Sequence, residues 1–190
     1  MSNESNYLSE KVIVTNILNG KIQDFAVVVK NTEKLVTQIV RKMTDNEDNQ
    51  KDLVQDIYLK AYKNLSSFQF RSKLSTWIAN IAYNATINYL QKKKIPIIEI
   101  ESTLESKLVI TENPELVAIK SESLQILNAA IDKLPPLYKT LITLYHLEEL
   151  SNKEISAITN LPEGTIKSYL SRARKMLKDN INHHYKNMQL

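Results

Sequence analysis

The chain has 190 residues, of which 43% are hydrophobic, which is enough for one or two modest cores. It has no cysteine, so it can form neither a disulfide framework nor a thiolate zinc site, and this fits a reducing compartment. Two glycines and five prolines favour helices throughout and argue against a β-sandwich. No apolar run approaches the roughly 20 residues of a membrane span and no signal peptide opens the chain, so we expect a cytoplasmic protein.

Charge is distributed unevenly along the sequence. The net charge of +4 divides into −1 over residues 1–20, +6 over 21–95, −5 over 96–132 and +4 over 133–190. Two basic segments are therefore separated by an acidic one, which contains two prolines and shows no long periodic pattern. We expect an all-α protein in which two small helical domains are joined by a flexible acidic linker.

Domain boundaries follow from this division. We predict a disordered tail over residues 1–10, a helical domain over 11–94, the linker over 95–117, a second helical domain over 118–180 and a tail over 181–190. Apolar periodicity in the first domain predicts helices over 12–18, 22–43, 50–64 and 74–92.

The predicted helix over residues 50–64 has two unlike faces. One is apolar. On the other, Leu59 is framed by Asp52, Gln55 and Asp56. A single exposed leucine is ordinary, but one among carboxylates and an amide at helical spacing is typical of a docking site for another protein. The pattern alone leaves the docking site and an ordinary surface equally open.

The predicted helix over residues 74–92 carries asparagine at every fourth position from Asn80 to Asn88. Asparagine is a poor helix former, and its amide can pair with a base edge. Cationic residues flank this ladder and an aromatic ring lies at its boundary, an arrangement that suits a strand held by its phosphates. The alternative is an ordinary polar face with Trp77 in the core. The residues that we assign to this surface are Arg71, Lys73, Trp77, Asn80, Asn84, Asn88 and Lys92.

Residues 148–178 predict a helix, a tight turn and a second helix with a basic outer face. Ser151 and Glu154 have capping-box spacing at the start of the first helix, and Gly164 opens the second. This is how a helix-turn-helix protein presents a helix to the major groove of DNA. The alternative without a DNA-binding role is an amphipathic hairpin with a solvated basic face. The residues that we assign to duplex contact are Thr165, Lys167, Ser168, Ser171, Arg172, Arg174 and Lys175.

Catalytic chemistry is not indicated by the sequence. The three histidines do not pair with carboxylates at a recognisable metal or triad spacing, and two glycines cannot build a phosphate-binding loop. We expect no enzyme activity, no catalytic residue, no metal, no cofactor and no small-molecule substrate.

Both ends of the chain resemble the extracytoplasmic-function (ECF) sigma factors, a branch of the sigma-70 family of bacterial RNA polymerase specificity subunits. Residues 52–90 resemble region 2 of that family through the runs DLVQD and WIANIAYN. Residues 130–177 resemble region 4 through an LP entry followed by EIS, GTIKS and RAR. The sequence departs from the family at Asn88 and Gln91, where Asp-x-x-Arg is common, and at Tyr169, where a basic residue is frequent.

The resemblance implies roles and partners. The chain would bind core RNA polymerase, at the coiled coil of its largest subunit and at its flap. It would melt the minus-ten promoter element with the 74–92 helix and the loop before it, and grip the minus-thirty-five element as duplex. An anti-sigma protein, often membrane-anchored in this family, would hold it inactive. The alternative is a stand-alone helix-turn-helix regulator that binds duplex DNA as a dimer. The residues implied to contact polymerase are Asp52, Leu53, Gln55, Asp56 and Leu59.

Overall fold

The computed structural model describes residues 3–44, 46–95 and 118–187, and these residues form helices without any strand. The predicted linker over 95–117 lies outside the described residues except at its first position. The first half contains α1 (Asn3–Leu18), η1 (Ile22–Asp24), α2 (Phe25–Met43), α3 (Glu47–Lys63), η2 (Leu65–Ser67) and α4 (Leu74–Lys92). The second half contains α5 (Ala118–Asp132), α6 (Pro136–Ile142), η3 (Thr143–Leu147), α7 (Asn152–Thr159) and α8 (Glu163–Asn187). The all-α prediction is confirmed.

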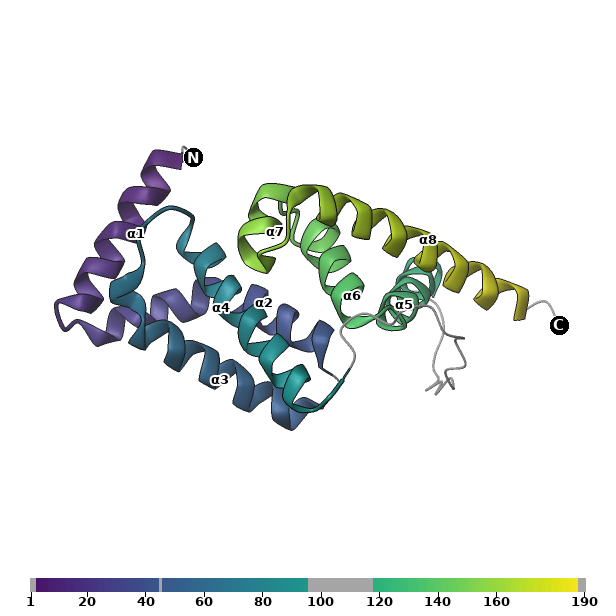
Figure 1. Cartoon of the computed structure of the whole chain (residues 1–190), viewed down its shortest axis with the longest axis horizontal. Helices are drawn as coiled ribbons and strands as arrows, with labels where there is room; N and C mark the ends of the chain where they lie inside the picture. The colour runs from purple at the N-terminus through teal and green to yellow at the C-terminus, as the bar shows by residue number, and fades with distance from the viewer. Residues whose placement is uncertain (1–2, 45, 96–117, 188–190) are drawn as a thin grey trace.

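In the first half, α2, α3 and α4 pack against one another, and α1 lies across one end of them (Figure 1). The buried side of α2 includes Val28, Val36 and Val40 at helical spacing, as the periodicity predicts. Ile57 on α3 and Ile78 on α4 are fully buried against them. None of the helices in the described part of the chain is long and apolar enough to cross a membrane.

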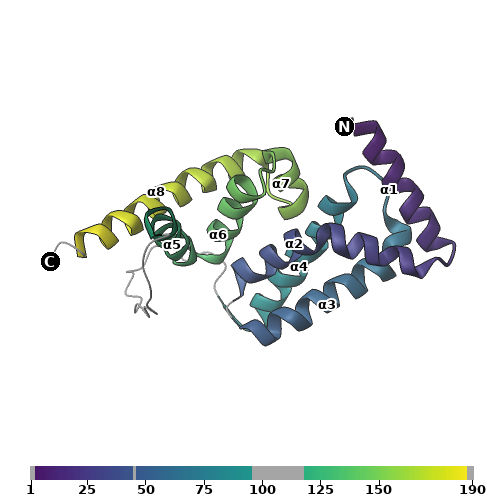
Figure 2. The same ribbon diagram turned by 180° about the vertical axis from the view of Figure 1, so that it is seen from behind.

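In the second half, α5, α6 and α7 all pack against α8, and α5 lies farther along α8 than α7 does (Figure 1). Figure 2 shows α8 extending well beyond the other helices of this half. The two halves are in contact, through α4 with α7 and through α2 with α6. Buried apolar side chains from both halves form one continuous cluster.

Both predicted tails need correction. Residues 3–10, which we expected to be disordered, belong to α1, because Val14 and Ile17 bury one side of that helix and anchor it to the core. Gly20, with φ of 96°, then ends α1 at the predicted stop, and the Lys21 N–H bonds back to Asn16 O. At the other end, α8 continues through residues 181–187 instead of stopping at 180.

The capping box predicted for the helix-turn-helix is present at the start of α7. Ser151 Oγ accepts a hydrogen bond from Glu154 N–H at 3.2 Å, and Ser151 N–H donates to Glu154 Oε2 at 3.0 Å. We expect Ser151→Ala to lower the free energy of unfolding by about 0.5–2 kcal/mol, because the first turn loses its cap. Chemical denaturation measures this change. Ser171→Ala, at an exposed position of α8, is the control, and equal losses in the two variants would contradict the role of the cap.

Candidate nucleic-acid interface

Helices α7 and α8 form the predicted helix-turn-helix. Ile155 and Ile158 of α7 are fully buried, together with Ile166 of α8, and they hold the two helices together. Asn160 ends α7 in the left-handed conformation with φ of 59°, and Ser156 Oγ donates to Leu161 O at 2.6 Å across the turn. The orientation of α8 is therefore fixed by packing and by hydrogen bonds within the turn.

The outer face of α8 is exposed as predicted. Thr165 is half-buried at its edge, and Ser168 Oγ donates to Gly164 O at 3.0 Å. A Cβ at Gly164 would meet no atom within 4 Å, so the space above the first turn of α8 is open. The exposed side chains on this face are Lys167, Ser168, Ser171, Arg172 and Lys175.

Two further residues of α8 make contacts within the protein, although Arg174 is itself exposed. Arg174 was assigned to duplex contact, but its Nε donates to His146 Nε2 at 3.3 Å and its guanidinium lies 5.4 Å from the ring centre of Tyr145. Burial, followed by the nearby Arg174 charge, lowers the pKa of His146. Tyr169 packs edge-on against Tyr138 of α6 with ring centres 5.6 Å apart, which gives this departure from the family pattern a structural role.

An aromatic cluster lies before and on α4. The ring centres of Phe68 and Phe70 are 4.7 Å apart, and those of Phe68 and Trp77 are 5.4 Å apart. Trp77 is half-buried and so takes part in the core, as the alternative reading of this face expected. Phe70 has φ of 55°, which turns the loop sharply just ahead of Arg71, an exposed cation.

The N-terminus of α4 is capped by Glu10, a residue for which the sequence predicted a disordered tail. Leu74 N–H donates to Glu10 Oε2 of α1 at 3.1 Å, while the N-cap residue Lys73 makes no side-chain cap. Burial raises the pKa of Glu10, and the Leu74 N–H and the Lys73 charge act in the opposite direction. Glu10 therefore holds the junction between the aromatic loop and α4.

The amide ladder of α4 is split between two environments. Asn80 Nδ2 donates to Ile158 O at 2.8 Å and to Ala157 O at 3.2 Å, both on α7. Asn84 Nδ2 donates to Asn80 Oδ1 at 3.1 Å. Asn88 is exposed. Lys92, the last assigned cation of this surface, is also exposed.

Lys73 makes an ion pair across the two halves, with Nζ 2.7 Å from Glu154 Oε1. The hydrogen bond from Lys73 lowers the pKa of Glu154; burial opposes this shift, and the Ser151 hydrogen bonds add to it. Because the pKa of Glu154 is lower in the folded chain than in the unfolded chain, the ionised carboxylate stabilises the fold at pH values above the pKa of the unfolded state. This stabilisation is lost as the pH falls through the pKa of the folded state. Exposed pairs of this kind contribute about 0–1 kcal/mol.

We expect Lys73→Met to raise the pKa of Glu154 toward its usual range, because the ammonium that favours the carboxylate is removed. An NMR titration of the Glu154 side chain measures this shift. Lys63→Met, which removes a cation from α3, is the control and should leave the pKa of Glu154 unchanged. A Glu154 pKa that stays the same in Lys73→Met would contradict the contact between α4 and α7.

The acidic face of α3 is exposed to solvent. Asp52, Gln55 and Asp56 are exposed, and Leu59 is 55% exposed. Leu53 is buried in the core next to Ile57, as the apolar periodicity of this helix predicts, although the family resemblance also implied a polymerase contact for it.

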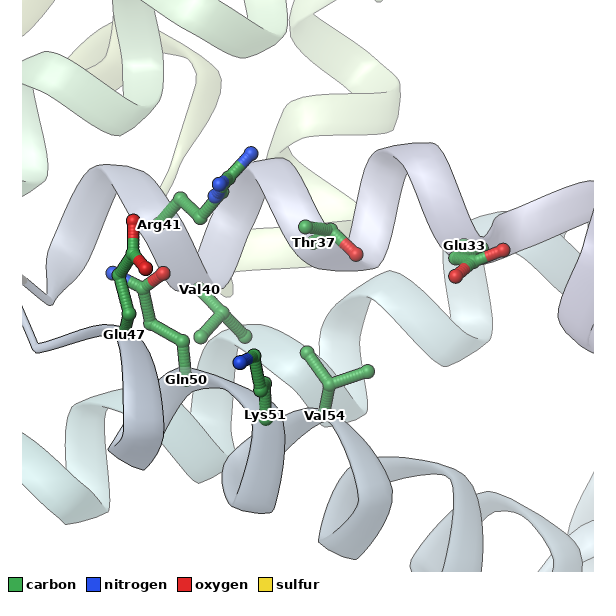
Figure 3. Close-up of a pocket in the computed structure, with 8 residues that line it drawn as sticks. All are labelled: Glu33, Thr37, Val40, Arg41, Glu47, Gln50, Lys51 and Val54. Carbon is green, nitrogen blue, oxygen red and sulfur yellow. The ribbon is translucent and has the colours of Figure 1, made fainter.

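A groove of about 380 Å³ runs between α2 and α3 beside this face, as Figure 3 shows. Val40 and Val54 supply its apolar part, and the charged side chains around them have both signs. Over the described residues, no three histidine, cysteine or acidic side chains gather as metal ligands do. The lining residues are Glu33, Thr37, Val40, Arg41, Glu47, Gln50, Lys51 and Val54.

These features define a helical DNA-binding protein with a helix-turn-helix in its second half. Family models agree, since Sigma-70 region 2 matches residues 28–95 and Sigma-70 region 4 matches residues 124–177. The chain belongs to the ECF RNA polymerase sigma factors of the sigma-70 family.

Relatives of similar length support this assignment. The chain is 30% identical to the ECF RNA polymerase sigma factor SigW of Bacillus subtilis, over 87% of this chain and 92% of that protein. It is 32% identical to the ECF RNA polymerase sigma-E factor of Escherichia coli K12, over 93% of this chain and 96% of that protein.

Solved structures show the same fold. CnrH in complex with the cytosolic domain of CnrY matches with a TM-score of 0.65 and 17% identity, over 92% of this chain and 97% of that chain. The sigma factor RpoE of Bartonella quintana, in complex with the anti-sigma factor NepR, matches with a TM-score of 0.63 and 25% identity, over 84% of this chain and 98% of that chain.

Proposed function

We propose that this sigma factor acts as a specificity subunit that recognises a promoter through two separate surfaces and catalyses no reaction itself. The basic outer face of α8 grips the minus-thirty-five element as duplex, and the surface of α4 with the loop before it captures the minus-ten element as a single strand. The observation that carries the proposal is that one chain of a sigma family combines an exposed cationic helix in a helix-turn-helix with an amide and aromatic surface on a second helical bundle.

Duplex binding by α8 is supported by the exposure of its cations and by the open space over its first turn. Lys167 and Arg172 contact phosphates or base edges, and Gly164 lets a phosphate approach the backbone. Thr165, Ser168, Ser171 and Lys175 complete this surface. Arg174 contributes less, because its guanidinium is already engaged with Tyr145 and His146.

Single-strand capture is supported by the chemistry around the N-terminus of α4. Arg71 and Lys73 hold phosphates on the entry side and Lys92 holds them on the exit side. The Phe68–Trp77 cluster offers ring faces on which a base stacks, and Asn80, Asn84 and Asn88 offer amides to base edges. Taking a base out of a duplex costs a few kcal/mol, which these contacts must offset.

Polymerase binding is supported by the acidic face of α3. Asp52, Gln55, Asp56 and Leu59 form a surface with an apolar centre and a charged rim, and the groove of Figure 3 extends it toward α2. Leu53 contributes indirectly, because its burial in the core holds α3 in position. Region 4 binds the polymerase flap, and an anti-sigma protein is the regulatory partner. A stand-alone dimeric regulator would leave this face and the α4 surface without a role.

Individual contacts on either DNA surface are few, so each half alone binds DNA weakly at physiological salt. Holding both halves on polymerase raises the effective concentration of each surface at its own element. In this proposal the first half of the chain binds core polymerase and the minus-ten element, and the second half binds the minus-thirty-five element.

Asp52→Ala with Asp56→Ala tests the polymerase-binding face. We expect the double variant to lose co-migration with core RNA polymerase on size exclusion while its affinity for duplex promoter DNA is unchanged, since the substituted face lies on α3 and away from α8. Asp179→Ala, which removes an exposed acid from α8, is the control and keeps both activities. A double variant that still co-migrates with the polymerase would remove the basis for this surface.

A further inference from the structure

Helix α1 lies outside the stretch that matches Sigma-70 region 2, which begins at residue 28, yet it contacts the segment assigned to the minus-ten element. It packs against η2, just before the loop over residues 68–73, and Figure 1 shows that loop passing beside it on the way to α4. Val14 and Ile17 bury one side of α1, so the helix is fixed to the core. Its acid Glu10 reaches the far end of the loop, at Leu74.

The contact of Glu10 supplies what the start of α4 lacks. The first N–H groups of a helix have no partner within it, and the N-cap residue Lys73 offers none from its side chain. Glu10 Oε2 accepts the Leu74 N–H at 3.1 Å, and a carboxylate also suits the positive end of the helix dipole. Leu74 is itself buried, so removal of the carboxylate would leave a buried donor without its hydrogen bond.

The first turn of α4 connects this contact to the residues assigned to DNA. Trp77 N–H donates to Lys73 O at 3.1 Å within the turn, and the Trp77 ring lies 5.4 Å from that of Phe68. Phe70 has φ of 55°, a conformation that a residue other than glycine keeps only where its surroundings hold it. A shift of this turn would therefore move Lys73 and disturb the aromatic cluster together.

Glu10 is unsuited to contact DNA itself, because a carboxylate repels phosphates. Burial raises the pKa of Glu10, while the Leu74 N–H and then the Lys73 charge act against this shift, so the carboxylate lies close enough to Lys73 to interact with it. An acid beside a cation that holds phosphate weakens DNA binding if charge alone matters. Charge and position therefore predict opposite effects when Glu10 is removed.

We propose that Glu10 is a positioning residue for minus-ten capture: by capping α4 from α1, it holds the 68–73 loop and the first turn of α4 in the arrangement that receives a base. Glu10 acts through the Leu74 N–H and touches no DNA. This proposal rests on the proposed function, and it adds that α1, which precedes the Sigma-70 region 2 match, is part of the promoter-reading apparatus.

Three substitutions of Glu10 separate the cap from the charge. Glu10→Gln keeps the length and an oxygen that accepts the Leu74 N–H, but it removes the charge. Glu10→Asp keeps the charge but shortens the side chain by a methylene, so that its oxygen no longer reaches. Glu10→Ala removes both. Asp179→Ala, at an exposed position of α8, removes one negative charge elsewhere and is the control for net charge.

Base capture is measured on the complex of each chain with core RNA polymerase, and core polymerase alone is the blank. The probes are a fluorescent pool of random single strands of about 20 nucleotides and an abasic strand of the same length, both read by anisotropy. Only the pool has bases to stack, whereas both probes offer the same phosphates. The ratio of the two affinities therefore reports base capture.

We expect the unsubstituted chain to bind the pool about ten-fold more tightly than the abasic strand, as one well-stacked base provides. Glu10→Ala and Glu10→Asp should lose most of this preference, while Glu10→Gln and Asp179→Ala keep it. A preference that survives in Glu10→Ala, or one that is lost in Glu10→Gln, would overturn the proposal alone. An unsubstituted chain without any preference would overturn the minus-ten assignment on which the proposal rests.

Trp77 reports the position of the aromatic cluster without DNA, because it is the only tryptophan of the chain. If the first turn of α4 shifts, its ring becomes more exposed. We therefore expect the emission of the free chain to move to longer wavelength, and quenching by acrylamide to rise, in Glu10→Ala and Glu10→Asp but not in Glu10→Gln. Circular dichroism checks that each variant is folded, and Glu10→Asp retains the test where Glu10→Ala does not fold. Unchanged Trp77 emission in the folded variants would contradict the positioning role.

Discussion

Ile166→Ala should destabilise the chain by about 2–5 kcal/mol, a large part of the stability of a domain of this size. Ile166 is fully buried at the meeting point of α7 and α8, and the cavity left by truncation cannot be filled by neighbours that are themselves fully buried. We also expect Ile166→Ala to lose duplex binding, because α8 is no longer held against α7. Thermal or chemical unfolding followed by circular dichroism measures the loss.

Lys167→Ala is the matched control for that variant. Lys167 is the next residue along α8 and is exposed, so its truncation should change stability by less than about 0.5 kcal/mol. If the two variants lost similar stability, the inward and outward faces of α8 would be assigned wrongly.

Lys167→Ala with Arg172→Ala should weaken promoter duplex binding by about 1–3 kcal/mol and reduce the salt dependence by about two counterions. Both side chains lie on the exposed face of α8 and neither supports the core, so folding and polymerase binding should be retained. Binding isotherms at several salt concentrations provide both quantities.

Lys60→Ala with Lys63→Ala removes the same charge from α3 and is the control for a loss of net charge. An equal effect of the two pairs would mean that the cations act only through the overall charge of the chain. A loss of polymerase binding by the α8 pair, matching the loss expected for Asp52→Ala with Asp56→Ala, would contradict the division of roles between the two halves.

Local signals in the sequence predicted local structure well. The helix α4 begins and ends at the predicted residues, and the capping box of α7 is formed by the two predicted side chains. Both depend on patterns within a few turns of one helix, where spacing alone determines which residues meet.

Long-range contacts were missed for a physical reason. Glu10 caps α4 from 64 positions away, and Lys73 meets Glu154 across 81 positions. Such partners are chosen by how helices pack, and no local pattern records the choice. The contacts of Arg174 were missed for the same reason, since η3 brings the Tyr145 ring and the His146 imidazole to its guanidinium.

Leu53 shows that periodicity and family resemblance can disagree about one residue. The helix turns by about 100° per residue, so the periodicity places Leu53 on the buried side although Asp52 and Gln55 next to it are exposed. Family resemblance assigns the whole run to polymerase contact, and burial separates the residue that packs the helix from those on its surface.

The most direct test of whether the chain directs promoter recognition is to mix it, purified, with bacterial core RNA polymerase. Co-migration is measured by size exclusion, and run-off transcription is measured on a genomic fragment library. We expect a stable complex and new transcription start sites that share two upstream motifs at a fixed spacing. Failure to bind the polymerase, together with tight binding of a palindromic duplex by the chain alone, would contradict this expectation.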